Sequence, residues 1–505
     1  MAANVIMVQG TASHAGKSLM VAALCRIFRQ DGYNVAPFKA QNMSLNSFVT
    51  PDGGEIGRAQ AVQAEAACVL PTVEMNPILL KPESDSRSQI VLMGKPYDTV
   101  AAVNYYDLKS HLWPYVTASL DKLRSEYDVI VIEGAGSPAE VNLSDREIVN
   151  MRVARYANSP VLLVGDIERG GVFASLIGTM EILEQEERSL VKAFIINKFR
   201  GDSTLLESGI RFLEERTKVP VAGVIPWFHD IYIAEEDILG LEGRQYNQSS
   251  THIDISVIQF PHLSNFDDFD PLEDETSVSL RYVNSVNQLG NPDLIILPGS
   301  KTTISDLTWL REHGFIDKIL DLYHNGTFII GICGGYQMLG QKILDPDKVE
   351  SHIAEDTGLG LLPLTTVFAG HKETHQVIGK VLQGTGLLAG ANYLEIEGYE
   401  IHMGLSTGKP DITPFELSRR DIQNSTHQEG ALDSEGRVLG TFVHGLFQST
   451  PLRRAILDNV AFYRGKPVLE ESNVTKKDEE YNKLAALVRK SLAMDLIYHI
   501  TGCGK

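Results

Sequence analysis

The chain has 505 residues and carries 65 acidic against 45 basic side chains, which gives a net charge of −20 and argues against a broad binding surface for nucleic acid or an anionic membrane. Its length predicts two to four domains at about 150 residues each, and its composition is that of an ordinary globular protein. The N-terminus lacks a basic segment with a cleavage site, and the chain has no uninterrupted apolar run of about 18 residues, so we expect a cytoplasmic protein.

The first predicted elements are a strand, a glycine-rich loop and a helix. The strand covers residues 5–8, and the loop runs from Gly10 to Ser18 ahead of a helical pattern. This is the context of a phosphate-binding loop, although five residues rather than four separate Gly10 from Gly16, which indicates a longer variant. The N–H groups of the loop would hold phosphate oxygens, Lys17 would reach the terminal phosphates and Ser18 would bind Mg²⁺.

A polar stretch that looks irregular follows the first helix. It contains residues 37–44 and then a helical pattern over residues 55–65. Arg58 and Gln60 could simply form the exposed face of that helix, and the sequence leaves this interpretation open. The alternative is a polar shelf that binds substrate beside the nucleotide.

Four further apolar runs predict buried strands of a parallel sheet, with helix-length segments between them. They cover residues 128–132, 160–164, 193–196 and 221–225. Charged and polar residues follow three of them, namely Glu133, the pair Asp166 and Arg169, and Asn197. Any one of these could belong to a solvated loop, but three in succession at the ligand-binding edge of an α/β sheet favour a binding site, with Glu133 as a candidate ligand of Mg²⁺.

The predicted domain boundaries follow from a polar segment without an apolar period at residues 241–251, which we interpret as a linker. The domains are then 1–240 and 252–450, followed by a helical extension at 451–505. The charged helices of this extension could pack on a sheet or on a second copy of the chain, so the sequence leaves a homo-oligomer open.

The second domain contains the most informative stretch of the chain. Further predicted strands cover residues 255–258, 278–283 and 293–297, and an apolar run at 327–330 leads into the sequence around Cys333. A pattern of glycine, nucleophile and glycine after a buried strand is typical of a strand-to-helix elbow that exposes the nucleophile. The N–H groups of the following helix favour a thiolate, so we expect Cys333 to be a nucleophile rather than an inert buried cysteine.

A nucleophile on an elbow needs a base and an oxyanion hole. His444 lies at the end of an apolar run late in the domain and is the preferred base, with His402 as the fallback, because spacing alone does not decide between them. Backbone N–H groups at Gly299 and Gly334 would stabilise the developing oxyanion.

These motifs resemble known protein families. Residues 331–340 together with His444 resemble a class I, triad-type glutamine amidotransferase domain. The loop at residues 10–18 with residues 133–136 resembles dethiobiotin synthetase, which accounts for the longer phosphate loop. Joined in this order, and with residues 38–44, 55–60, 166–171 and 398–404, the set is similar to the cobyric acid synthase family of cobalamin biosynthesis, and the similarity covers nearly the whole chain.

The resemblance implies an α/β protein with two doubly wound, mostly parallel-sheet domains. The N-terminal domain would be of the P-loop type and would bind ATP and the corrinoid, and the C-terminal domain would be a flavodoxin-like triad glutamine amidotransferase. The implied sites are catalytic Cys333 and His444, oxyanion and glutamine contacts at Gly299, Gly334 and Gln337, nucleotide contacts at Thr11, Gly16, Lys17, Ser18 and Asn197, candidate substrate contacts at Lys39, Gln41, Asn42, Arg58, Gln60, Asp166 and Arg169, and Mg²⁺ ligands Ser18 and Glu133.

The implied activity is that of a glutamine-hydrolysing carbon–nitrogen ligase. It would use ATP, Mg²⁺ and L-glutamine to amidate the b, d, e and g carboxylates of adenosylcobyrinic acid a,c-diamide and give adenosylcobyric acid through acyl phosphates. Two alternatives stay open at this point. One is a related corrinoid a,c-diamide synthase, and the other is a nucleotide-switched protein of the partition-ATPase type with a non-catalytic glutaminase-like module.

One departure from the triad pattern bears on mechanism. Triad amidotransferases carry an acid two residues after the catalytic histidine, and here the sequence His444-Gly445-Leu446 has none. We therefore expect a Cys–His dyad, whose imidazole is less firmly oriented, and a slow glutaminase that depends on the other domain. Fast glutamine hydrolysis by the isolated C-terminal domain would contradict this expectation.

Overall fold

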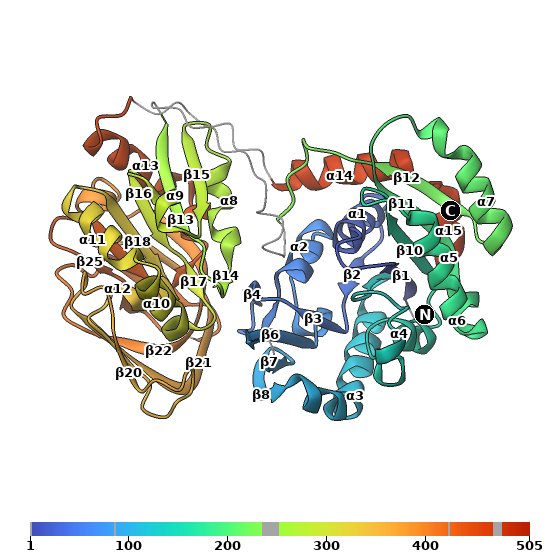
Figure 1. Cartoon of the computed structure of the whole chain (residues 1–505), viewed down its shortest axis with the longest axis horizontal. Helices are drawn as coiled ribbons and strands as arrows, with labels where there is room; N and C mark the ends of the chain where they lie inside the picture. Colours follow the sequence, from blue (N-terminus) through green and yellow to red (C-terminus); the bar gives the residue numbers. More distant parts are fainter. Residues whose placement is uncertain (1–2, 85–86, 235–251, 423–424, 468–476, 505) are drawn as a thin grey trace. The chain divides into compact units, whose positions relative to one another are not determined.

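The computed structural model describes residues 3–84, 87–234, 252–422, 425–467 and 477–504. Contacts divide the chain into two compact units. Unit 1 comprises residues 1–44, 56–234 and 475–505, and unit 2 comprises residues 45–55 and 235–474 (Figure 1). The predicted linker at 241–251 lies outside the described residues. Each unit contains a mainly parallel sheet between helices, which confirms the predicted α/β class.

The central sheet of unit 1 has six parallel strands in the order β12-β11-β10-β1-β9-β2. The strands are β1 (Asn4–Gly10), β2 (Val35–Phe38), β9 (Val129–Glu133), β10 (Val161–Asp166), β11 (Val191–Phe199) and β12 (Val221–Pro226). They are continuous apolar runs because separate hydrophobic clusters cover the two faces of the sheet, one around α1 and one around α3 and α5. The helices are α1 (Lys17–Gln30), α2 (Arg58–Ala66), α3 (Ala102–Glu126), α4 (Met151–Ala157), α5 (Val172–Ile182), α6 (Gln185–Leu190) and α7 (Glu207–Thr217), with short 3₁₀ turns η1 (Val73–Met75), η2 (Val141–Arg146) and η3 (Ser203–Leu206).

A second, smaller sheet in unit 1 has the order β3-β6-β7-β8. Its strands are β3 (Gln41–Met43), β6 (Ile78–Ser84), β7 (Arg87–Leu92) and β8 (Lys95–Ala101). The stretch at 37–44, which we expected to be irregular, therefore contributes the end of β2 and all of β3. The sequence signal is weak because β3 is only three residues long and polar, too short for an alternation of apolar and polar positions to be recognised.

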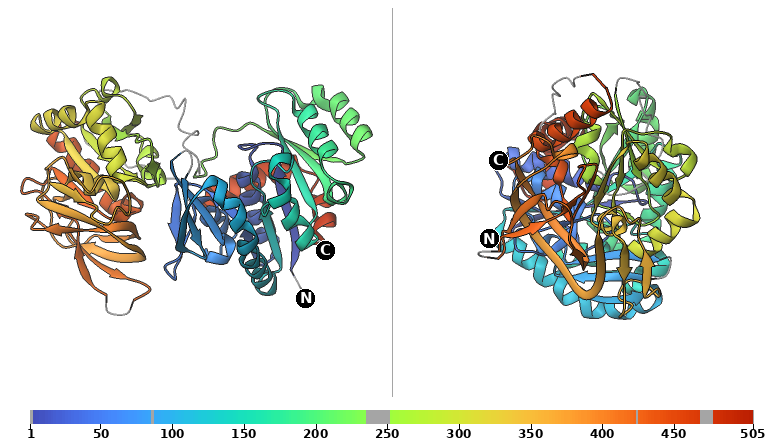
Figure 2. Two further views of the ribbon diagram at one scale, coloured as in Figure 1. Left: turned by 60° about the horizontal axis from the view of Figure 1, so that its bottom comes forward. Right: turned by 90° about the vertical axis from the view of Figure 1, so that its left-hand side faces the viewer.

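The C-terminal segment is shared between the units. Helix α13 (Thr450–Tyr463) packs on the core of unit 2, whereas α14 (Lys477–Ser491) and α15 (Met494–Thr501) pack on the α1 face of the unit 1 sheet. Figures 1 and 2 show the red helices α14 and α15 among the elements of unit 1. Asp478 accepts a 2.7 Å hydrogen bond from Arg26 of α1, and Tyr481 donates to Glu65 over 2.9 Å. The span 451–505 treated as one extension in the sequence is thus divided.

The main sheet of unit 2 has the order β15-β13-β16-β18-β26-β25, and only its last pair is antiparallel. A second, largely antiparallel sheet is built on the long strands β21 and β22 and includes β19, β20, β23, β24 and β27. The strands are β4 (Ser47–Val49), β5 (Glu55–Gly57), which crosses the unit boundary, β13 (Ile253–Ile258), β14 (Leu263–Ser264), β15 (Val278–Val283), β16 (Leu294–Leu297), β17 (Gly299–Ser300), β18 (Phe328–Ile332), β19 (Lys342–Leu344), β20 (Glu355–Thr357), β21 (Leu364–Val381), β22 (Glu395–Gly408), β23 (Phe415–Arg419), β24 (His427–Glu429), β25 (Ala431–Leu432), β26 (Val438–Thr441) and β27 (Val443–His444). The other helical elements are η5 (Phe266–Phe269), α8 (Asp270–Glu273), α9 (Val286–Leu289), α10 (Thr303–Glu312), α11 (Phe315–His324), α12 (Gly334–Leu339), η6 (Gly386–Leu388) and η7 (Leu446–Gln448).

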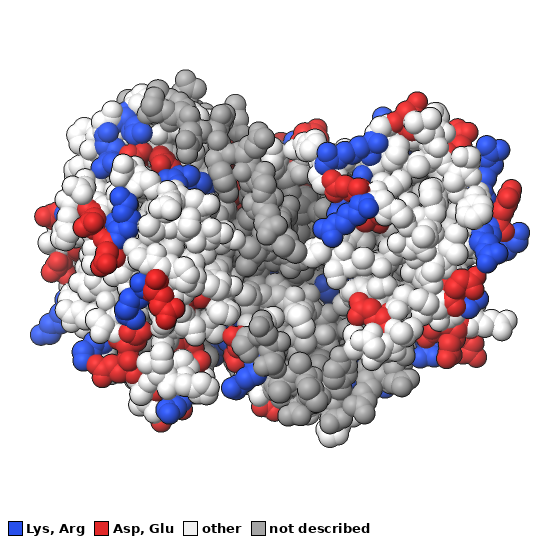
Figure 3. All heavy atoms as spheres, in the orientation of Figure 1, with Lys and Arg blue, Asp and Glu red and all other residues white. Residues whose placement is uncertain are grey.

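The surface carries charges of both signs. Figure 3 shows basic and acidic side chains interspersed on the face in view rather than gathered into a field of one sign. Within the described residues, no helix has the combination of length and apolar character that crossing a bilayer requires.

Candidate functional site

The phosphate loop connects β1 to α1. Gly16 ends it with φ of 96°, a left-handed conformation that favours glycine. A Cβ at Gly16 would lie 2.1 Å from Nδ2 of Asn197, which itself donates a 2.9 Å hydrogen bond to the carbonyl of Ala15. At the start of the loop, the N–H of Thr11 donates to the carbonyl of Val164 on β10 over 2.9 Å. Asn197, near the end of β11, therefore lies against the loop.

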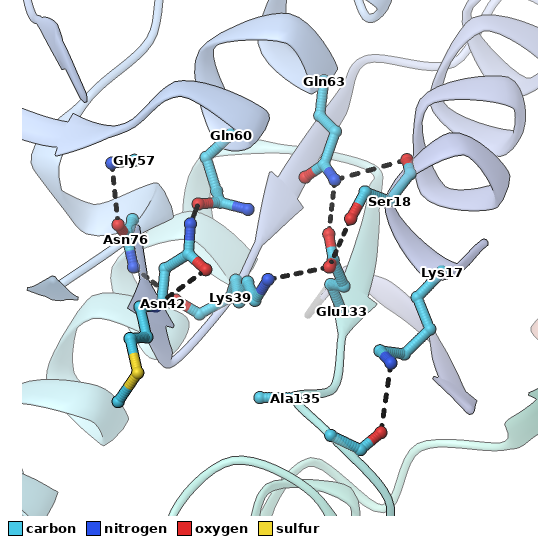
Figure 4. Close-up of polar contacts among 12 residues, drawn as sticks. Lys17, Ser18, Lys39, Asn42, Gly57, Gln60, Gln63, Asn76, Glu133 and Ala135 are labelled. Atoms are coloured by element: carbon cyan, nitrogen blue, oxygen red, sulfur yellow. Dashed lines mark hydrogen bonds and ion pairs between the residues drawn. The ribbon is translucent and has the colours of Figure 1, made fainter. Parts of the chain in front are cut away.

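Lys17 spans the loop. Its Nζ donates to the carbonyl oxygens of Ala12, at 2.9 Å, and Gly136, at 3.1 Å. Figure 4 shows the side chain of Lys17 pointing toward the backbone that follows Ala135. The ammonium is thus held by carbonyl groups that the oxygens of a phosphate could replace.

Glu133 is the centre of a buried polar network at the end of β9 (Figure 4). Its Oε1 accepts hydrogen bonds of 2.8 Å from both Ser18 and Lys39, and its Oε2 accepts one of 2.5 Å from Gln63. Burial opposes ionisation of this carboxyl, but the Lys39 ammonium and the hydrogen bonds from Gln63 and Ser18 outweigh it and hold the pKa of Glu133 below its usual value. The network therefore presents an ionised carboxylate beside the phosphate loop.

This donor set suits a magnesium ion. Mg²⁺ takes hard oxygen ligands, and it typically binds one or two carboxylates and keeps several waters. The Ser18 hydroxyl and the Glu133 carboxylate supply such oxygens next to the loop. Among the described residues, no group of three or more His, Cys, Asp or Glu side chains is arranged to hold a metal ion.

The polar shelf beside this network consists of Lys39, Asn42, Arg58 and Gln60, and it is buried rather than exposed. Lys39, Arg58 and Gln60 are at most 6% exposed, so the alternative that α2 presents a solvated face is wrong. Nδ2 of Asn42 donates to Oε1 of Gln60 over 3.0 Å, whereas Nε2 of Gln60 has no hydrogen-bond partner among the described residues. Gln41, on β3 beside Asn42, is only half-buried. Buried polar groups in this arrangement can recognise a polar ligand.

The other two candidate substrate-binding residues, Asp166 and Arg169, lie at the end of β10 and in the turn that follows it. Asp166, at the end of β10, is half-buried and forms a 2.9 Å ion pair with Lys198. Arg169 lies on the exposed surface of the following turn. Asp166 is thus already paired with a basic residue from the end of β11.

Cys333 occupies the sharp turn between β18 and α12. Its φ of 53° and ψ of −110° are unusual for a residue with a side chain, as is common at functional sites. The turn depends on its glycines, since a Cβ at Gly335 would lie 1.9 Å from the carbonyl oxygen of Leu297. The Cys333 thiol donates to the carbonyl of Ile401 over 3.4 Å. The predicted strand-to-helix elbow is therefore present.

His444 has an acidic partner that lies far away from it in the sequence. Its Nδ1 lies 2.7 Å from Oδ2 of Asp268, whose Oδ1 accepts a 2.8 Å hydrogen bond from the N–H of Gly445. Burial disfavours the imidazolium, but the Asp268 carboxylate and the neighbouring Cys333 more than compensate and raise the pKa of His444 to about 10.

The expectation of a dyad without an orienting acid is thus wrong. Asp268 stands on η5, 176 residues before His444, and within an unremarkable Phe-Asp-Asp-Phe sequence. No spacing rule connects the two residues, because the fold rather than a local motif brings them together.

His402, the fallback base, has a different environment. Its ring stacks on Phe442 with a centroid distance of 3.8 Å, and its Nδ1 lies 3.1 Å from the carbonyl of Gly404. Burial outweighs the nearby Glu400 and lowers the pKa of His402 to about 4.

The remaining predicted residues surround the elbow. A Cβ at Gly299 would lie 3.3 Å from Cε1 of His444, and a Cβ at Gly334 would lie 2.9 Å from the backbone nitrogen of Ser300. Gln337 is buried, where its Nε2 donates to the carbonyl of Met403 over 2.8 Å and its Oε1 accepts from Thr303 over 3.2 Å. Gly299, Gly334 and Gln337 therefore lie in the same site as Cys333 and His444.

The family models match each half of the chain. Residues 6–240 match the CobQ/CobB/MinD/ParA nucleotide binding domain, and residues 254–452 match the CobB/CobQ-like glutamine amidotransferase domain. These matches correspond to the phosphate loop of unit 1 and the Cys333 elbow of unit 2.

Full-length relatives extend this result. The chain is 51% identical to a cobyric acid synthase of Dehalococcoides mccartyi, with 99% of both chains covered. It is 49% identical to a cobyric acid synthase of Desulfitobacterium hafniense, with 100% of this chain and 99% of the relative covered. A cobyric acid synthase of Listeria monocytogenes is 46% identical over 98% of this chain and 96% of its own length. By these similarities, and with both sites in place, the chain belongs to the cobyric acid synthase family.

Proposed function

We propose that this protein uses ATP and glutamine to amidate the b, d, e and g carboxylates of adenosylcobyrinic acid a,c-diamide, which gives adenosylcobyric acid. The observation that carries the proposal is the presence, in one chain, of a phosphate loop with an ionised acid and of a Cys–His–Asp arrangement on an elbow. Membership of the cobyric acid synthase family supplies the substrate class. ATP and glutamine are cytoplasmic metabolites, so we place the reaction in the cytoplasm.

Unit 1 would activate the substrate carboxylate. A carboxylate is a poor acyl electrophile, and its oxygen attacks the γ-phosphorus of ATP to give an acyl phosphate and ADP. Lys17 would offset the charge on the transferring phosphoryl group, and Ser18 with Glu133 would hold a Mg²⁺ ion, which would supply further positive charge there. Lys39, whose Nζ lies 2.8 Å from Oε1 of Glu133, would add a second cation beside this carboxylate.

The polar shelf would bind the corrinoid. Asn42 and Gln60 present buried amides beside Lys39, and Arg58 adds a second buried cation. These groups suit a ligand whose edge carries carboxylates and amides, because cations stabilise the former and side-chain amides pair with the latter. Arg169 and Gln41 would contribute from more exposed positions.

Unit 2 would supply ammonia. The Cys333 thiolate attacks the side-chain amide carbon of glutamine, and the oxyanion receives hydrogen bonds from the backbone at Gly299 and Gly334. His444 gives a proton to the leaving ammonia, and water then hydrolyses the thioester to glutamate and the free thiol. Asp268 would fix the tautomer and orientation of His444, the role of the acid in a triad.

The ammonia would then attack the acyl phosphate and displace inorganic phosphate. Each cycle therefore converts one carboxyl group to one primary amide and consumes one ATP and one glutamine. Because protonated ammonia is not a nucleophile, the reaction requires ammonia to be delivered before it equilibrates with solvent.

The test is the mass of the corrinoid product. The protein is incubated with ATP, Mg²⁺, the a,c-diamide and either glutamine or an ammonium salt, and the product is analysed by mass spectrometry. We expect four successive replacements of carboxyl by amide with either nitrogen source. Failure to change the corrinoid mass with ATP and ammonia would contradict the proposed function.

A further inference from the structure

Residues 45–55 belong to unit 2 although the chain on both sides of them belongs to unit 1. In sequence they separate the two halves of the polar shelf, since Asn42 precedes them and Gln60 follows them. Asn42 and Asn46 are joined by at most about 14 Å of extended chain. A displacement at the shelf therefore has a short covalent route into this segment.

The segment contacts the residue that begins the element carrying Asp268. Asn265 immediately precedes η5, is 2% exposed and has the left-handed φ of 54°. Its N–H donates to Oδ1 of Asn46 over 2.6 Å, and its Oδ1 accepts a 3.1 Å hydrogen bond from the N–H of Ser47. This reciprocal pair fixes the backbone three residues before Asp268.

The same segment also contacts Tyr399, which lies against the catalytic histidine. The Tyr399 ring stacks on His444 with a centroid distance of 5.2 Å and an interplanar angle of 14°. Its hydroxyl donates to the carbonyl of Ser47 over 3.3 Å and accepts from Nδ2 of Asn265 over 3.4 Å. The hydroxyl thus connects Ser47, Asn265 and the ring that supports His444.

Apolar contacts extend the same connection toward Cys333. Val49 is fully buried in a small cluster with Tyr399 and Ile401, against which Phe48 packs. The carbonyl of Ile401 accepts the hydrogen bond from the Cys333 thiol. Residues 46–49 therefore contact the neighbours of all three side chains of the Cys–His–Asp arrangement.

The far end of the segment is anchored in unit 2 as well. Glu55 forms a buried 2.5 Å ion pair with Lys372, and the carbonyl of Gly53 accepts a 2.8 Å hydrogen bond from Thr374. Residues 45–55 are therefore held to unit 2 near both of their ends.

We propose that Asn265 and Tyr399 are positioning residues for His444. Residues 45–55 change the positions of these two side chains when the corrinoid binds at the shelf near Asn42 and Gln60. The proposal rests on the proposed function. This change in residues 45–55 makes glutamine hydrolysis depend on bound ATP and corrinoid, so that ammonia is released when an acyl phosphate is present to react with it.

The experiment compares wild type with Tyr399→Phe and Asn46→Ala. Glutamate release is measured with and without ATP and the corrinoid, and amidation is measured with an ammonium salt. In wild type we expect ATP and corrinoid together to stimulate hydrolysis by about 5- to 150-fold. In both variants we expect less than about 2-fold stimulation, through kcat rather than the KM for glutamine, since the removed groups contact other residues and not the substrate.

Tyr393→Phe and Asn392→Ala are matched controls on exposed positions just before β22, and both should keep the wild-type stimulation. Ammonia-dependent amidation should stay at the wild-type level in all four variants, because it needs only unit 1, and denaturant unfolding of unit 2 reports whether the mutated unit folds. Tyr399→Phe keeps the test valid if Asn46→Ala does not fold, because it removes only a hydroxyl.

Wild-type stimulation in Tyr399→Phe, absence of stimulation in wild type, or loss of ammonia-dependent amidation in Tyr399→Phe would each overturn the proposal. A wild-type protein that cannot amidate the corrinoid with ATP and ammonia would instead contradict the proposed function itself.

Discussion

The two sites of this protein are assembled in different ways. The phosphate-loop site uses residues that follow neighbouring strands, since Glu133 ends β9 and Ser18 lies in the first turn of α1, the helix after β1. The elbow site gathers Cys333, His444 and Asp268 from three separate elements. Local motifs therefore describe the first site almost completely, whereas the second is complete only after the chain has folded.

The two units also differ in the pKa shifts of their buried carboxyl groups. Glu133 is kept ionised because Lys39 and two hydrogen bonds outweigh its burial. In unit 2, Glu429 accepts hydrogen bonds from the hydroxyl of Thr441 and the N–H of Phe442, and burial together with nearby Glu400 raises its pKa to about 8. A buried carboxyl beside a lysine, such as Glu133, is thus kept charged. A buried carboxyl held by hydroxyl and N–H donors near another acid, such as Glu429, has a raised pKa and tends to be neutral.

The largest expected effects separate the two sites. Cys333→Ala should lower glutamine-dependent amidation by at least about 10³-fold and leave ammonia-dependent amidation intact, because only the nucleophile for glutamine is lost. Lys17→Ala should lower both by at least about 10³-fold, because no acyl phosphate forms. Corrinoid amidation with each nitrogen source is the measurement. Loss of both activities in folded Cys333→Ala would refute the division of labour.

The next effect tests the acid that the fold supplies. Asp268→Asn should lower glutamine hydrolysis by about 10²- to 10⁴-fold, because the amide favours the wrong tautomer of His444 and cannot stabilise its imidazolium. Asp267→Asn, on the adjacent residue of η5, is the matched control for a change of charge at this turn. Glutamate release at saturating glutamine measures the effect. Near-normal hydrolysis in Asp268→Asn would show that a Cys–His dyad suffices.

A smaller effect probes the network around Glu133. Lys39→Met keeps much of the side-chain volume but removes the ammonium, and we expect ammonia-dependent amidation to fall by about 10²-fold. Glutamine hydrolysis without ATP and corrinoid should not change, since Lys39 belongs to unit 1. Equal losses in the two assays would contradict the separation of the sites.

The smallest effect concerns stability and pH. The pKa of Glu429 is raised to about 8 in the folded protein, so its contribution to stability is lost as the pH rises from its unfolded value of 4.5 toward 8. Glu429→Gln removes this dependence, so relative to wild type it should raise the free energy of unfolding of unit 2 more at pH 9 than at pH 5. Denaturant unfolding at the two pH values measures the difference. An equal effect at both would show that Glu429 is ionised throughout.

The sequence by itself determined the α/β class, the phosphate loop and the Cys333 elbow. These features are readable because each depends on residues within a few positions of one another. The left-handed turn at residue 16 favours glycine, and the close approach of residue 335 to Leu297 leaves no room for a side chain. Buried parallel strands require continuous apolar runs. Such requirements leave a local pattern in the chain.

Tertiary structure alone decided the partner of His444, the membership of residues 45–55 in unit 2 and the docking of α14 on α1. Each of these joins segments far apart in the chain. A carboxylate, an asparagine or a charged helix face has the same local pattern whether it faces solvent or a distant element, and the physical choice between them is made by which surfaces the fold brings together.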